Sequence, residues 1–114
     1  MSEAHDHEVP EGAALFPVIP PDLGVNPLLL AVLHAVVFLA GSEEAVVHPD
    51  AGGETIDYMA AYLQRLRGPE LNKVRADLKT LTDYARQEQW PREKIEFLES
   101  FLADCGVGER GKAS

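Results

Sequence analysis

The chain has 114 residues, a net charge of −9 and a single cysteine, and hydrophobic and charged residues make up 46% and 25% of it. This size and composition indicate one globular domain and exclude a chain that is disordered over most of its length. A single cysteine excludes an internal disulfide and a cysteine-based zinc site. Residues 1–53 contain no Lys or Arg, so this half of the chain repels phosphate, and we expect no binding of nucleic acid or of a membrane surface.

The N-terminal region divides into two segments of different character. Residues 1–14 are polar and acidic, and they lack the basic start and apolar stretch of a secretory signal. We expect a flexible tail there, and a protein of the reducing cytoplasm. Residues 15–25 combine three prolines with large apolar side chains. Because proline interrupts helices and central strands, this segment predicts an extended arm that packs across the helices.

Residues 27–40 predict the central helix of the domain. Asn26 can cap this helix, Pro27 fits its first turn, and Gly41 fits the position after its end. The segment carries no charge, and its apolar side chains cover every face of a helix, so we expect other elements to surround it. A membrane-spanning helix needs about 20 apolar residues, which makes this segment a core helix.

The rest of the chain predicts three further helices. Apolar residues recur at helical spacing over residues 54–67, 69–87 and 91–104. The second helix begins at Asp50 instead of Glu54 if the glycine pair 52–53 fits into its first turn. Short joints favour antiparallel neighbours, and the fold class is therefore all-α, a small four-helix bundle-like domain that ends near Gly106. We expect residues 107–114 to form a flexible C-terminal tail.

Two aromatic pairs lie on helix flanks that the main apolar stripes do not use. Tyr58 and Tyr62 form one pair, and Phe97 and Phe101 form the other. One cover for these side chains is the arm 15–25. The other is a partner protein or a second copy, since aromatic residues are enriched in interface cores, and an arm exchanged between two protomers would combine both covers.

A basic stripe follows the third predicted helix. Arg75, Lys79 and Arg86 lie on one side of it, diluted by Asp77 and Asp83, which makes a weak nucleic-acid footprint. This stripe predicts a solvated face or a dock for an acidic segment, either the chain's own arm or a partner.

Histidines and carboxylates supply the remaining candidate site. His34 is the one strongly polar residue of the apolar helix, so it is either a core histidine with hydrogen-bond partners or a ligand in a pocket. His48, Asp50 and Asp57 fall within ten residues of each other beside Glu54, and such groups can hold a metal ion. The spacings of known di-iron and zinc motifs are absent, and we expect no metal or cofactor.

These observations favour a non-enzymatic protein. We expect an interaction, regulatory or accessory domain that binds a partner protein or itself as a homodimer. Its expected contact residues are Tyr58, Tyr62, Phe97, Phe101, Arg75, Lys79 and Arg86. The alternative is a domain that binds a small ligand or a metal through His34, His48 and the nearby carboxylates Asp50 and Asp57.

Overall fold

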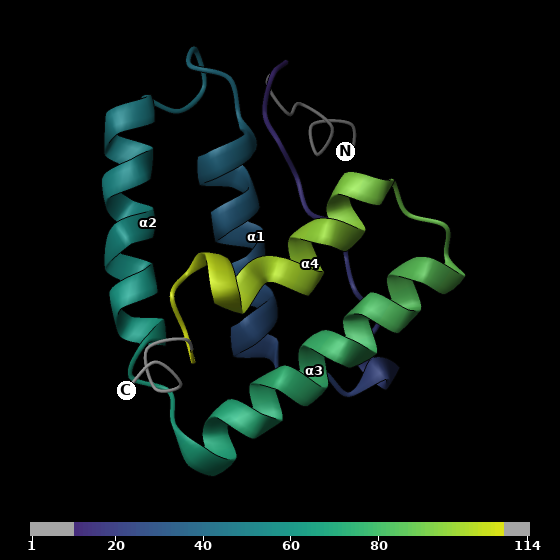
Figure 1. The fold of residues 1–114 in the computed structure, drawn as a ribbon. Helices are drawn as coiled ribbons and strands as arrows, with labels where there is room; N and C mark the ends of the chain where they lie inside the picture. The colour runs from purple at the N-terminus through teal and green to yellow at the C-terminus, as the bar shows by residue number, and fades with distance from the viewer. Residues whose placement is uncertain (1–10, 109–114) are drawn as a thin grey trace.

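Regular structure in the described part of the chain is entirely helical. The computed structural model describes residues 11–108, and these contain no strand (Figure 1). The elements are the 3-10 helix η2 (Pro21–Leu23) and the α-helices α1 (Pro27–Gly41), α2 (Pro49–Leu63), α3 (Gly68–Gln87) and α4 (Arg92–Asp104). The prediction of an all-α fold is confirmed. None of these helices is long and apolar enough to cross a membrane.

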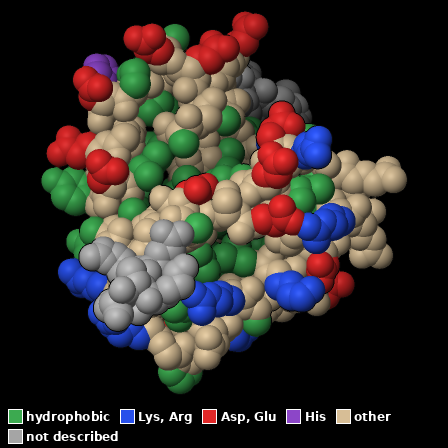
Figure 2. Space-filling view, viewed as in Figure 1, with side chains coloured by type: hydrophobic (Ala, Val, Ile, Leu, Met, Phe, Trp, Pro, Cys, Tyr) green, Lys and Arg blue, Asp and Glu red, His purple; other side chains and the backbone are tan. Residues whose placement is uncertain are grey.

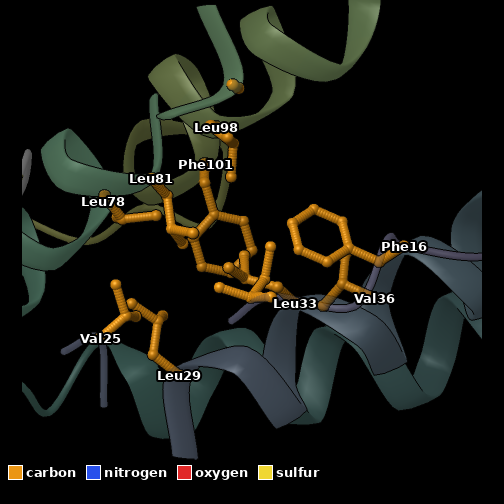
Figure 3. Close-up of a cluster of buried hydrophobic side chains, with 11 residues drawn as sticks. Phe16, Val25, Leu29, Leu33, Val36, Leu78, Leu81, Leu98 and Phe101 are labelled. Atoms are coloured by element: carbon orange, nitrogen blue, oxygen red, sulfur yellow. The ribbon is translucent and has the colours of Figure 1, made fainter. Parts of the chain in front are cut away.

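The helices pair as two hairpins, and the core lies between them. α1 packs against α2, and α3 packs against α4 (Figure 1). Leu29, Leu33 and Val36 recur at the spacing of one helix face on α1, and all three are buried. This inner face of α1 meets buried side chains of α3 and α4, as Figure 3 shows for Leu78, Leu81, Leu98 and Phe101. Within α2, only Gly52 is buried.

The N-terminus of α1 is capped as the sequence predicts, and a residue of α3 contacts it. The Oδ1 atom of Asn26 accepts a hydrogen bond from the backbone N–H of Leu28 at 2.8 Å, and Pro27 occupies the first turn. Asp77 of α3 is only 5% exposed. Its carboxylate accepts hydrogen bonds from the backbone N–H of Asn26 at 3.1 Å and from the Lys73 ammonium at 2.9 Å. Asp77 therefore ties α3 to the first turn of α1.

The second helix begins at Pro49, one residue before the alternative start at Asp50 and not at Glu54, because the chain caps this helix earlier. The Nδ1 atom of His48 accepts a hydrogen bond from the backbone N–H of Asp50 at 3.2 Å, and Pro49 takes the first helical position. Gly52 fits inside the helix because a side chain there would lie 3.0 Å from the Leu39 carbonyl oxygen of α1. The helix ends at Leu63, before the predicted residue 67, because the chain turns there toward Gly68, which has a φ of +55°.

The ends of α3 and α4 share one capping geometry, in which a left-handed residue follows the helix. After α3 this residue is Gln89, with a φ of +59°, and the N–H of Trp90 donates to the Ala85 carbonyl at 2.9 Å. After α4 it is Gly106, and the N–H of Val107 donates to the Leu102 carbonyl at 2.8 Å. Val107 is 3% exposed. The predicted boundary of the domain at residue 106 is therefore too early.

The N-terminal segment is anchored at both of its ends, although it has little regular structure. The Gly12 carbonyl accepts the N–H of Glu43 at 2.9 Å, and the N–H of Ala14 donates to the Ser42 Oγ at 2.9 Å. Farther along, Phe16 and Ile19 are buried. The predicted tail 1–14 therefore ends too late by two or three residues, while residues 1–10 and 109–114 of the predicted tails lie outside the described residues.

Candidate protein-interaction surface

One side of α1 carries apolar side chains that no described element of the chain covers. Leu33, on the inner face, is fully buried, and at about 100° per residue Leu28, Ala31 and Phe38 lie on the far side of the helix from it. Leu28 is 75% exposed and Phe38 is 37% exposed, and Ala31 is also exposed. Within residues 11–108, the prediction that other elements surround this helix is thus wrong, because α3 and α4 cover its inner face and α2 packs beside it, while the far side stays open.

Tyr58 and Tyr62 of α2 point to this same side. Gln64, at the end of α2, donates from its Nε2 to the Cys105 carbonyl at the end of α4, at 2.8 Å, and so marks the side of α2 that faces α4. Tyr62 lies about 160° around the helix from Gln64, and Tyr58 lies one turn earlier. The two tyrosines are 62% and 63% exposed. We call this surface of the α1–α2 hairpin the outer face and define it by Leu28, Ala31, Phe38, Tyr58 and Tyr62.

The outer face continues into an apolar hollow at the N-terminal end of α1. Leu28 lines this hollow together with Leu63, Leu66 and Val74, and its volume is about 520 Å³. The hollow lies where α1, the end of α2 and the start of α3 meet, so the apolar surface reaches beyond the hairpin itself.

Opposite charges border the two tyrosines at opposite ends of α2. The Tyr58 hydroxyl donates to the Glu54 carboxylate at 3.4 Å, and the Arg65 guanidinium lies over the Tyr62 ring, 5.0 Å from its centroid. On the side of the molecule that carries α4, Figure 2 shows acidic side chains around the joined ends of α1 and α2, and a mixture of Lys, Arg, Asp and Glu over α3 and α4. The face is therefore apolar in its middle, acidic at one end and basic at the other.

In the second predicted pair, Phe101 is buried in the core and Phe97 packs half-buried against it. Phe101 is 1% exposed, and the ring centroids of the two residues are 5.5 Å apart. Phe16 of the N-terminal segment packs on Phe97 with its ring centroid at 6.4 Å and on Trp90 at 5.5 Å. The expectation that Phe97 and Phe101 contact a partner is thus corrected, since Phe16 supplies the cover within the chain.

Arg75, Lys79 and Arg86 line a hollow of about 720 Å³ between α3 and α4. Its floor is apolar and includes Leu98 and Val107. Lys79 pairs with Asp83 at 3.1 Å, and Arg86 pairs with Glu99 and lies 3.8 Å from Asp83. The chain's own acids therefore balance two of the three cations, which weakens the attraction of this stripe for an acidic partner.

The two histidines are not brought together. His34 is half-buried on α1, and its ring packs edge-on against Phe16, with centroids 5.1 Å apart. His48 is exposed at the start of α2, where it caps the helix beside Asp50. His34 lies seven residues before the end of α1, about 10 Å along the helix axis from the connection that carries His48. Across residues 11–108, no three His, Cys, Asp or Glu side chains gather as metal ligands; Asp57 is exposed on α2.

Cys105 has the one thiol of the chain and lies half-buried at the end of α4. Burial of the thiol, and to a smaller extent the neighbouring Asp104 carboxylate, raises the pKa of Cys105 above its ordinary value. A raised pKa lowers the thiolate fraction at neutral pH, which makes this cysteine a poor nucleophile.

Leu28, Ala31 and Phe38 were not among the residues expected to contact a partner. Their signal was present in the sequence, as apolar side chains on every face of residues 27–40, but the sequence does not show which face stays open. Comparison of the chain with protein-family models, with curated proteins and with solved structures finds no match.

Proposed function

We propose that this chain is a non-enzymatic protein-interaction domain whose contact surface is the outer face of the α1–α2 hairpin. The observation that carries the proposal is the exposure of large apolar side chains on one side of one hairpin: Leu28, Phe38, Tyr58 and Tyr62. Contiguous apolar surface on a small domain is typical of a protein contact, and tyrosine and phenylalanine are enriched in the cores of such contacts.

A regulatory or accessory role fits this surface better than catalysis. Leu28, Ala31 and Phe38 supply binding area and no reactive group. Within the described residues, the two tyrosines have no histidine beside them on this face, because His34 packs on Phe16 and His48 caps α2. Bringing a partner onto the outer face would also complete the bundle-like packing expected from the sequence, since α1 would then be covered on every side.

The alternative, a small-ligand or metal site, has weaker support. It requires His34 and His48 to act together with Asp50 and Asp57, whereas His48 caps α2 and His34 packs on Phe16.

The proposal is tested by photo-crosslinking in the cells that make the chain. A photoreactive phenylalanine analogue replaces Tyr62 on the outer face or, as the control, the exposed Ala76 on α3. We expect a defined protein adduct from position 62 that the additional substitution Ala31→Glu removes, and no such adduct from position 76. Equal adducts from both positions, or none from position 62, would refute a contact surface at this face.

A further inference from the structure

We infer that the partner at the outer face is a second copy of this chain, packed with its α1–α2 hairpin antiparallel to the first. This inference rests on the proposed function and names its partner. It follows from three features of the face: the absence of charge in its middle, the small residue at that point, and the order of charges along α2.

The middle of the face is free of charge, which a self-contact requires. In a two-fold dimer each residue near the axis meets its own copy, so any charge there would meet the same charge. With a net charge of −9, two copies repel over most of their surfaces. α1 carries no Asp, Glu, Lys or Arg from Pro27 to Gly41, and it therefore offers two copies a place to meet without opposing like charges.

Ala31 sets how closely two such helices can approach. It is exposed on the outer face of α1, between the larger Leu28, about one turn before it, and Phe38, about two turns after it. A small side chain at a helix crossing lets the backbones come close, and the flanking large side chains then fill the space on either side. Paired in this way, α1 would be covered by α2, by the core and by its own copy.

The charges along α2 select the antiparallel orientation. Glu54 in its first half accepts a hydrogen bond from the Tyr58 hydroxyl, and Arg65, which lies over the Tyr62 ring, follows its end. An antiparallel pair places Glu54 of one α2 near Arg65 of the other, with the tyrosines between them. A parallel pair would place acid against acid and base against base, which is unfavourable for two chains that are already acidic.

Sedimentation velocity of the purified full chain over a series of concentrations gives the first test. We expect a reversible dimer for the wild type, a monomer for Ala31→Glu and a dimer for Ala76→Glu. The last variant is the matched control, because it adds the same charge to an exposed alanine of α3. Circular dichroism and urea unfolding establish that both variants stay folded.

Charge reversal tests the orientation. Glu54→Arg and Arg65→Glu should each raise the dimer dissociation constant about tenfold, because the two-fold axis repeats every lost pair and adds like-charge repulsion. The double variant restores both pairs across the interface and should bind nearly as tightly as the wild type. Residue 65 lies just after α2, about 16 Å from residue 54 along the helix axis. Recovery of the dimer affinity in the double variant therefore cannot come from pairing within one chain.

Three results would overturn the inference. They are a wild-type chain that stays monomeric through the submillimolar range, a dimer that Ala31→Glu leaves intact, and a double variant that is as weak as its two single changes combined. A monomer in solution that still forms the crosslink from position 62 to a different protein would reject the second copy while leaving the proposed function standing. Loss of both the dimer and the crosslink would reject both.

Discussion

The exposed surfaces of the two hairpins carry different kinds of side chain. On α3 and α4, charged side chains pair across the surface, as in Lys79–Asp83, Arg86–Glu99 and Arg92–Glu96. On α1 and α2, the described residues form no ion pair with one another, and leucine, phenylalanine and tyrosine side chains face outward. Exposed ion pairs add little to stability, so the difference concerns contact more than strength. The α3–α4 hairpin exposes ion pairs that are compatible with water, and the α1–α2 hairpin exposes apolar side chains that a partner can cover.

Leucine truncation on the two faces of α1 should show directly that one face is buried and the other is open. Leu33→Ala removes a fully buried side chain and should lower the free energy of unfolding by about 3–4 kcal/mol. Leu28→Ala removes the same atoms from a position that is 75% exposed and should lower it by less than about 1 kcal/mol. Urea unfolding at a concentration where the chain is monomeric measures both. Similar losses from the two changes would mean that the outer face is covered within the chain.

A second prediction concerns Asp77, which joins the two hairpins. Asp77→Ala leaves the backbone N–H of Asn26 without its partner and should lower the free energy of unfolding by about 2–3 kcal/mol. Asp77→Asn keeps an oxygen that can accept this hydrogen bond, so it should cost less than the alanine change. Urea unfolding of the two variants tests this order, and an asparagine variant as unstable as the alanine variant would assign the effect to the charge instead.

A third prediction is that α2 opens before the rest of the domain. Only Gly52 of α2 is buried, whereas α3 buries five residues, among them Leu78 and Leu81. Amide hydrogen exchange should therefore give α2 a free energy of opening about 1–2 kcal/mol below that of the core of α3. Exchange measured below and above the dimer dissociation constant sharpens the test, since dimer formation should slow exchange in α1 and α2 more than in α4. Equal protection in α2 and α3 at low concentration would contradict the comparison.

The smallest expected effect is at Gln89, after α3. A non-glycine residue with positive φ is strained, and glycine removes that strain at some cost in unfolded-chain entropy. Gln89→Gly should raise the free energy of unfolding by about 0.5–1 kcal/mol. The reverse change Gly106→Ala, at a φ of +76° after α4, should lower it by at least as much, because the added methyl group would also lie 3.0 Å from the Gln64 Nε2. Thermal unfolding measures both, and a destabilised Gln89→Gly would show that the glutamine side chain contributes more than its backbone costs.

The sequence predicts the parts of this fold that depend on local signals. Asn26 and Pro27 mark the start of α1, and the spacing of apolar residues places α3 and α4 within one or two residues. For α2 the sequence left two starts open, Glu54 and Asp50, and the structure lies one residue from the second: His48 caps the helix, and Gly52, a residue that usually weakens a helix, contacts α1. The open face of α1 could not be predicted, because a helix that is apolar all round has no pattern to show which side the core takes.

The hydrogen bond from Asn26 to Asp77 has a consequence for how the chain is made. The carboxylate that accepts the first N–H of the α1 cap lies 51 residues farther along the chain. During synthesis, the most apolar segment of the protein leaves the ribosome well before Asp77, α3 and α4 exist to hold and cover it. Nascent chains that stop short of α3 therefore present both faces of residues 27–41 at once. We expect such chains to aggregate or to bind a chaperone more readily than the folded domain does.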